Sequence, residues 1–188
     1  FFEVIVATNY DNKSLELLSI KKNLILLKIN KNIIQKKEFR STIFGVLNQE
    51  VDKETINRNF LKLAGYKKIS KMLMADLIFS IKVTKHLKSN SIVLSNNKQT
   101  LGIGSGQTSR IDALNIAIKK YKKNFRQKKF VCASDGFFPF IDSLSLLKKN
   151  NCSAVAQPYG SKNDNLNIDY SNKNKIPLYF IKNRLFKH

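Results

Sequence analysis

The N-terminal part of the chain alternates short apolar runs with segments in which apolar residues recur at helical spacing. A run of four to eight apolar residues is typical of a strand, whereas recurrence every three or four residues is typical of a helix with one buried face. Leu15, Leu18 and Ile20 illustrate the second pattern. The patterns predict strands at 1–7 and 24–29, helices at 11–23 and 71–88, and a strand or hairpin at 38–50.

The C-terminal part of the pattern predicts an α/β fold. An Asn-Asn-Lys turn separates two apolar runs at 91–95 and 99–104, which favours a hairpin. Ser109 then has the position of a helix N-cap, with Asp112 three residues later as a variant of the capping box. Beyond this point strand and helix patterns alternate, as in parallel βαβ packing. The expected elements are helices at 110–121, 142–150 and 167–174, strands at 128–134, 152–157 and 177–183, and a lysine-rich surface turn at 119–129.

The net charge raises a nucleic-acid hypothesis, which the distribution of the charge weakens. The 188 residues are 43% hydrophobic, enough for one domain or two small lobes, and no apolar run reaches the 18 residues of a membrane span. A charge of +21, from 34 Lys plus Arg against 13 Asp plus Glu, is typical of nucleic-acid binders. The lysines are scattered, however, and no nucleic-acid-binding motif is present. A basic nucleic-acid-binding α/β module is therefore kept as the alternative function.

Two cysteines are the only thiols of the chain. Cys132 and Cys152 each stand inside an apolar run, which predicts two buried thiols in strands. Neither a CxxC nor an HxE motif is present, so the sequence predicts no metal site. Unpaired thiols fit a reducing cytoplasm.

The stretch TLGIGSGQTSRID, residues 100–112, contains three alternating glycines. A dinucleotide-binding fingerprint needs GxGxxG, but Gln107 stands at its third glycine position, and no phosphate-binding GxxxxGK[ST] motif exists. One interpretation is that the glycines admit a ligand close to the backbone, with Arg110 as a planar donor for phosphate or carboxylate. The other is that the glycines serve a tight turn and Arg110 is solvated. The stretch alone leaves both open.

An aromatic segment, ASDGFFPFID at 133–142, follows the next predicted strand. Three Phe around a Pro are incompatible with a regular helix or a central strand. The segment is either a hydrophobic plug under a loop or an aromatic wall for a flat heterocycle, with Asp142 accepting ring N–H groups. QPYGSKND at 157–164 and the terminal NRLFKH also follow predicted strands. In open α/β sheets ligands bind at the C-terminal edge of the strands, so we expect these loops to form a ligand site.

Taken in order, these segments resemble one family. KSNSIVLSNNKQTLGIGSGQTSRID, ASDGFFPFID, QPYGSKND, NRLFKH and the segment EFRSTIFGVLNQE are similar to the AICAR transformylase domain of the bifunctional AICAR transformylase/IMP cyclohydrolase enzymes. The resemblance implies formyl transfer from the co-substrate 10-formyltetrahydrofolate to the 5-amino group of AICAR, in IMP biosynthesis. It also implies a cytidine-deaminase-like α/β fold, with a mixed sheet flanked by helices and without zinc. A homodimer with active sites at the subunit interface is implied as well. The chain would be the C-terminal part of the domain, with a connecting lobe at 1–70 and a deaminase-like lobe at 71–188.

The resemblance also assigns roles to residues. Its nucleotide-substrate contacts match Asn90, Arg110, Phe137 and Arg184, and its folate contacts match Ile111, Asp142, Ser161 and Lys162. The chain departs from the family pattern around the folate loops, with residues that change the expected detail of the folate pocket. These departures are Gly136, Ile141, Tyr159, Lys162 and Asn163.

The family's catalytic Lys-His pair is not matched in this chain. That pair belongs to a KHxxPxG segment expected upstream of Phe1, and Phe1 itself opens the chain inside a predicted strand. Lys85 and His86 are followed by no Pro-Gly, so we expect His86 to be a surface residue at a helix end. We therefore expect the chain to be a piece of a longer protein, without the IMP cyclohydrolase domain and inactive alone. A monovalent cation near Asp135 and His188, as in relatives, is left open.

Overall fold

The computed structural model describes residues 2–30, 37–125 and 129–187, and it divides the chain into two compact units. The units are Phe1–Glu54 and Thr55–His188, and each is described by itself. The sequence predicts a boundary between two lobes after residue 70. Residues 55–70 belong to the second unit because they contribute a strand to its sheet.

The second unit is built on a six-stranded mixed sheet with the strand order β5-β10-β9-β8-β6-β7. The three strands β8, β9 and β10 are parallel to one another, as the alternation of strand and helix predicted. The edge strand β5 is antiparallel to β10, and β6 is antiparallel to both β7 and β8. The strands are β5 (Leu61–Leu63), β6 (Ile92–Asn96), β7 (Gln99–Gly104), β8 (Phe130–Ser134), β9 (Cys152–Pro158) and β10 (Leu178–Ile181).

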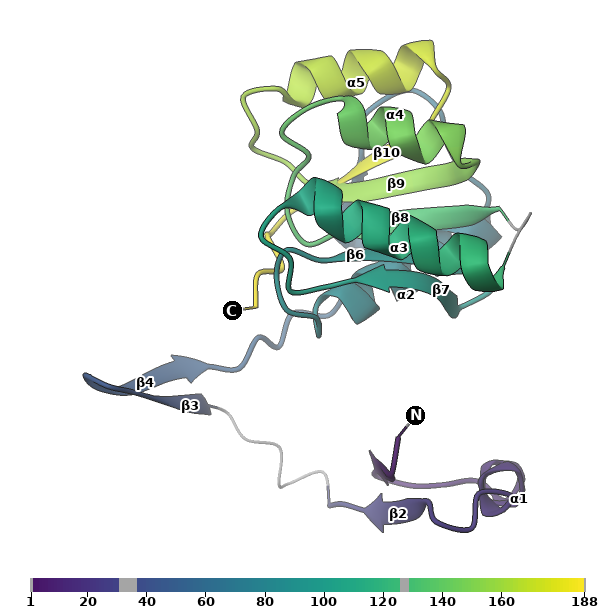
Figure 1. Cartoon of the computed structure of the whole chain (residues 1–188), viewed down its shortest axis with the longest axis vertical. Helices are drawn as coiled ribbons and strands as arrows, with labels where there is room; N and C mark the ends of the chain where they lie inside the picture. Colours follow the sequence, from purple (N-terminus) through teal and green to yellow (C-terminus); the bar gives the residue numbers. More distant parts are fainter. Residues whose placement is uncertain (1, 31–36, 126–128, 188) are drawn as a thin grey trace. The chain divides into compact units, whose positions relative to one another are not determined.

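Helices cover both faces of this sheet, which confirms the predicted mixed α/β class. Figure 1 shows α3, α4 and α5 side by side on one face and α2 on the other. Two hydrophobic clusters fill the layers, one between the sheet and α3 and α4, the other between the sheet and α2. The helices are α2 (Lys71–Thr84), α3 (Arg110–Asn124), α4 (Asp142–Lys149) and α5 (Asp164–Lys173). None of the helices in the described ranges is long and apolar enough to cross a membrane.

The predicted start of α3 is confirmed and its predicted end is wrong. The Ser109 hydroxyl accepts a hydrogen bond from the backbone N–H of Asp112 at 3.2 Å, and it donates a hydrogen bond to the Asp112 carboxylate at 2.5 Å. The helix continues to Asn124, so residues 119–124 of the expected surface turn are helical. The Tyr121 carbonyl accepts the N–H of Phe125 at 2.8 Å, which continues the helical hydrogen bonding beyond Tyr121. The buried Tyr121 ring packs edge-on against Phe130, at 4.7 Å between centroids. Residues 126–128 of that turn lie outside the described residues.

The short strand β5 was not predicted. It follows a single 3-10 turn, Arg58–Phe60, and has only three residues, too few to show a period of two. Its position depends on pairing with β10, in which Leu63 lies opposite Tyr179 and Leu61 opposite Ile181. Such long-range pairing leaves no local signal in the sequence.

The first unit contains two separate strand pairs. A parallel pair, β1 (Val4–Ala7) and β2 (Ile25–Lys28), is connected through α1 (Asn12–Ser19), and an antiparallel hairpin joins β3 (Lys37–Thr42) to β4 (Gly45–Glu50). The apolar runs predicted β1 and β2, the helical spacing predicted α1, and of the two alternatives given for 38–50, a strand or a hairpin, the structure has the hairpin. The hairpin tip is apolar and open, because Ile43 and Phe44 are 91% and 94% exposed.

A buried carboxylate fixes the β6–β7 hairpin of the second unit. Its turn residues Asn97 and Lys98 both have positive φ, 50° and 54°, as a type I′ turn requires. Asp76 on α2 is only 2% exposed, and its two carboxylate oxygens accept the backbone N–H groups of Asn97 at 3.0 Å and Lys98 at 2.8 Å. Asp76 therefore joins the helix on one face of the sheet to the turn that precedes β7.

We predict that Asp76→Asn lowers the free energy of unfolding by about 1–3 kcal/mol, because an amide NH2 group would face a buried N–H donor. The measurement is urea unfolding followed by circular dichroism. Asp169→Asn is the matched control, since Asp169 lies exposed on α5. Equal unfolding midpoints for the two variants would contradict the role given to Asp76.

Candidate functional site

One edge of the six-stranded sheet collects the unusual loops of the second unit. β7, β8, β9 and β10 all run in the same direction, so the loops that follow them meet at this edge. β6 runs the opposite way, and its first residues therefore lie at the same edge. The predicted clustering of the four loops is confirmed, and the segment before β6 joins them.

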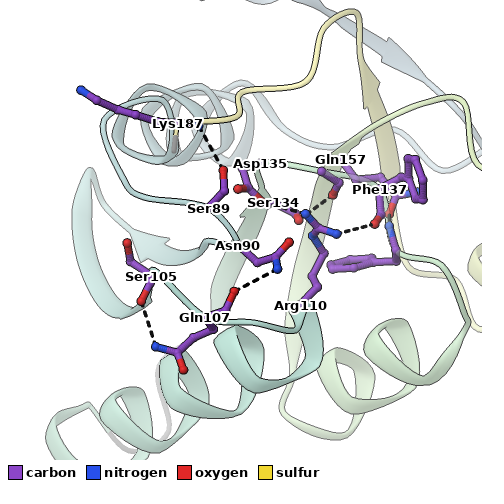
Figure 2. A network of polar contacts seen from close by, with 12 residues as sticks. Ser89, Asn90, Ser105, Gln107, Arg110, Ser134, Asp135, Phe137, Gln157 and Lys187 are labelled. Carbon is purple, nitrogen blue, oxygen red and sulfur yellow. Dashed lines mark hydrogen bonds and ion pairs between the residues drawn. The ribbon is translucent and has the colours of Figure 1, made fainter. Parts of the chain in front are cut away.

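The segment before β6 is fastened to the glycine-containing loop after β7. The Asn90 side-chain amide donates to the backbone carbonyls of Gln107 at 3.0 Å and Thr108 at 3.2 Å. The Gly106 N–H, in a residue with φ of +68°, donates to the Lys88 carbonyl at 2.7 Å. Asn90 therefore holds the loop that leads into α3, as Figure 2 shows.

The first two glycines of that stretch serve helix packing. A Cβ atom on Gly102 would lie 2.1 Å from the Ala117 carbonyl oxygen, and one on Gly104 would lie 1.9 Å from that of Ala113. Both contacts are to the backbone of α3, so only glycine lets the helix approach β7 this closely. The structure thus supports the interpretation of Gly102 and Gly104 as structural residues.

Arg110, the first residue of α3, reaches from the glycine-containing loop to the aromatic loop. Its Nη2 forms an ion pair with the Asp135 carboxylate at 3.0 Å, and its Nη1 donates to the Phe137 carbonyl at 3.2 Å. Asp135 is fully buried and the Arg110 side chain is 12% exposed. Breaking such a pair leaves an uncompensated buried charge, which is strongly destabilising. Arg110 is therefore a fixed part of the site and is not solvated.

Gly136 makes this placement of Arg110 possible. A Cβ atom at position 136 would lie 2.3 Å from Arg110 Nη2 and 2.9 Å from a ring carbon of Phe186. The departure at Gly136 therefore bears on the Arg110 side of the site, whereas we had expected it to affect the folate pocket.

Arg184, near the C-terminus, completes a second contact with the aromatic loop. Its guanidinium lies over the Phe137 ring at 5.0 Å from the centroid and 5.7 Å from that of Phe186. Arg184 is exposed, and no acidic side chain of the described residues pairs with it. Phe137 thus meets one arginine through its carbonyl and another through its ring.

The predicted folate residues lie at the same edge but are not joined to one another by hydrogen bonds in the described part of the chain. Ile111 packs half-buried against the core, and Asp142 begins α4 with its carboxylate accepting the Ser143 N–H at 2.6 Å. Ser161 accepts the Asn163 N–H at 3.1 Å in the loop after β9, where Lys162 is exposed. Of the eight predicted site residues, Arg110 and Arg184 each contact Phe137, and Asn90 supports the loop before Arg110.

Sequence reasoning missed the role of three amide side chains, of which Asn163 was named only as a departure from the family pattern. Gln157 is the last residue but one of β9, and Asn163 and Asn167 stand four residues apart at the start of α5. Each bonds to the backbone of the aromatic loop, at Phe138 or Pro139. The available signal was Gln157, a polar residue that ends an otherwise apolar run.

His86 lies outside this arrangement. It follows α2 as an exposed residue, with its N–H donating to the Val83 carbonyl at 3.0 Å, as expected for a helix end. In the described ranges no group of three or more His, Cys, Asp or Glu could hold a metal ion. His188 lies outside the described residues, and Asp135 is engaged by Arg110.

Two neighbouring pockets are lined by other residues. One of about 540 Å³ lies between β5, β10 and the start of α5, with Tyr159, Ile168 and Phe180 in its walls. The other, of about 330 Å³, is bounded by Phe140 and Ile141 of the aromatic loop. None of the eight predicted site residues lines either pocket, whereas three of the departures do: Tyr159 in the first pocket, and Ile141 and Asn163 in the second.

Comparison with known proteins decides the family. A family model described as AICARFT/IMPCHase bienzyme matches residues 1–120. The chain belongs to this family. Over its full length it is 42% identical to the bifunctional purine biosynthesis protein PurH of Bacteroides thetaiotaomicron, 39% to that of Fusobacterium nucleatum and 41% to that of Aquifex aeolicus. The chain spans 37% of the length of each of these relatives.

The thiols of this AICARFT/IMPCHase chain take no part in the site. Cys132 and Cys152 are buried and unpaired in β8 and β9, as predicted. Burial raises the pKa of Cys152 to about 12, and burial together with the neighbouring Cys152 raises the pKa of Cys132 well above its ordinary value. Both side chains therefore remain protonated and serve as packing residues.

We predict that both thiols resist iodoacetamide at pH 8 in the folded chain and react fully in urea.

Above about pH 9 the unfolded thiols ionise while the folded ones stay protonated, so the free energy of unfolding falls as pH rises. Each thiol contributes a slope of up to about 1.4 kcal/mol per pH unit, continuing for Cys152 to about pH 12. Urea unfolding of the chain and of Cys132→Ala/Cys152→Ala checks this, and rapid alkylation of the folded chain at pH 8 would refute it.

Proposed function

We propose that this chain is the C-terminal part of an AICAR transformylase domain and binds AICAR for formyl transfer from 10-formyltetrahydrofolate in IMP biosynthesis. The observation that carries the proposal is the meeting of Arg110, Phe137 and Arg184 at one sheet edge. These residues come from three segments far apart in the sequence. The family resemblance had assigned all three to the nucleotide substrate, and the names of the relatives state a role in purine biosynthesis.

The two arginines offer different chemistry to a nucleotide. The charge of Arg110 is balanced by Asp135, so this residue contributes oriented N–H groups. The exposed Arg184 has no acidic partner in the described residues and can supply a net positive charge to the phosphate. Phe137, beneath Arg184, supplies a ring face for the flat imidazole.

The folate side of the proposal rests on the matched positions alone. Asp142 would accept N–H groups of the pterin ring, and Ile111, Ser161 and Lys162 would line the same co-substrate site. In the transfer, the 5-amino nitrogen bonds to the formyl carbon, the bond from that carbon to N10 breaks, and the proton lost by the amine is taken up at N10 of tetrahydrofolate. We further propose that the protein is a transferase that acts as a cytoplasmic homodimer and that the longer parent enzyme also has IMP cyclohydrolase activity.

We predict that Arg184→Ala weakens AICAR binding about 10-fold or more, because a charge-assisted contact to phosphate contributes about 1.5–3 kcal/mol. Isothermal titration with AICAR and with its nucleoside separates the phosphate contribution, since the nucleoside should bind both proteins alike. Lys182→Ala is the matched control, because this exposed cation lies two residues away at the end of β10.

Identical AICAR affinity for the wild type, Arg184→Ala and Lys182→Ala would contradict the proposal. Displacement of AICAR by duplex DNA, with an affinity that falls steeply with salt, would favour the basic nucleic-acid-binding alternative.

A further inference from the structure

The aromatic loop between β8 and α4 buries backbone groups that belong to no strand or helix. Phe138 is fully buried in the core between the sheet and the helices, and Pro139 follows it. A buried peptide group without a hydrogen-bond partner costs about 1–3 kcal/mol, so such a loop requires dedicated partners.

Side-chain amides supply those partners. Gln157 Oε1 accepts the Phe138 N–H at 2.9 Å, and Asn167 Nδ2 donates to the Phe138 carbonyl at 2.9 Å. Asn163 Nδ2 donates to the Pro139 carbonyl at 2.6 Å. Gln157 and Asn167 are themselves fully buried.

A buried amide is costly where part of it has no partner, and Gln157 Nε2 and Asn167 Oδ1 have none among the described residues. Apolar residues could fill both positions without that cost, but they could neither accept from the Phe138 N–H nor donate to the Phe138 carbonyl. The Gln157 amide on β9 and the Asn167 amide on α5 bind the N–H and the carbonyl of a single residue, Phe138. They therefore fix the position and the rotation of that peptide segment.

Phe137 directly precedes Phe138 in the chain. Its carbonyl binds Arg110 and its ring lies under Arg184. Figure 2 shows Gln157, Phe137 and Arg110 close together at the sheet edge. A shift of the Phe138 peptide would move both contacts of Phe137 at once.

We propose that Gln157, Asn163 and Asn167 are positioning residues that hold the aromatic loop so that Phe137 and Arg184 meet the nucleotide substrate. We call the side chains of these three residues the amide clamp. The identity of the substrate rests on the proposed function. The amide clamp touches no reacting atom and acts through Phe137.

The test compares Asn167→Asp, Gln157→Met and Asn163→Ala with the control Asn150→Asp. Asn167→Asp keeps the shape but turns an oxygen toward the Phe138 carbonyl, and Gln157→Met removes the acceptor for the Phe138 N–H. Asn163→Ala removes the donor to the Pro139 carbonyl from a side chain that is only half-buried. Asn150 is a fair control because it is also buried and its amide donates to a carbonyl, that of Leu146, at 2.8 Å.

Two measurements are made on each folded chain. The first is the nuclear magnetic resonance frequency of the Arg184 Nε–H. We expect the ring current of Phe137 to shift this frequency, because the Arg184 guanidinium lies over that ring. This measurement needs no ligand. The second is the Kd for AICAR. We expect all three clamp variants to move the Arg184 resonance toward its random-coil frequency and to raise the Kd about 10-fold or more, while Asn150→Asp changes neither.

An Arg184 resonance that stays in place in the clamp variants would overturn the clamp, whatever the AICAR affinity. The same conclusion would follow if Asn150→Asp raised the Kd as much as Asn167→Asp, because the effect would then be one of general stability. If the wild type does not bind AICAR but the clamp variants still shift the Arg184 resonance, the proposed function is wrong. The positioning of the aromatic loop by the amide clamp is then still supported. If Asn167→Asp and Gln157→Met do not fold, Asn163→Ala decides between these outcomes.

Discussion

The site depends on satisfying the polar backbone of a buried, irregular loop. Residues 136–140 lie outside the sheet and the helices, yet Phe138 is fully buried. The Gly136 carbonyl accepts from the Ser134 hydroxyl, and the Phe137 carbonyl accepts from Arg110 at the start of α3. The two polar backbone groups of Phe138 bond to side-chain amides of β9 and α5. The loop is thus fixed by three elements of the second unit, and Phe137 is presented at the edge where the strands end.

The buried ion pair extends the same constraint to α3. Asp135 is fully buried and needs a positive partner, and Gly136 leaves the space in which the Arg110 guanidinium can reach it. Arg110 in turn begins a helix whose start is fixed by the Ser109 cap and whose approach to β7 depends on Gly102 and Gly104. Packing glycines, helix cap, ion pair and aromatic loop therefore form one connected arrangement.

Much of this fold could be predicted from the sequence because its elements have strong local patterns. The strands β8 and β9 are continuous apolar runs, and Ser109 marks the start of α3. The three-residue β5 could not be predicted, because it is defined by its pairing with β10. The role of Asp76 was missed for the same reason, since its partners Asn97 and Lys98 are about twenty residues away along the chain.

The candidate site divides in the same way. Arg110, Phe137 and Arg184 were found through the family resemblance, and the parallel strand order explains why they meet. The amides of Gln157 and Asn167 were not found, because their function depends on a loop geometry that the sequence does not encode locally. For Gly102 and Gly104 the sequence left a ligand loop and a structural role both open, and only their contacts with α3 show that they serve packing.

The most direct test of the account is to titrate the isotope-labelled chain with AICAR and follow its amide and arginine side-chain resonances. The account predicts saturable shifts concentrated at Arg110, Phe137 and Arg184, on the edge formed by the C-terminal ends of the parallel strands. Saturable shifts concentrated instead around Lys67, Lys129 and Lys175, three of the five lysines that line a separate pocket, would contradict it.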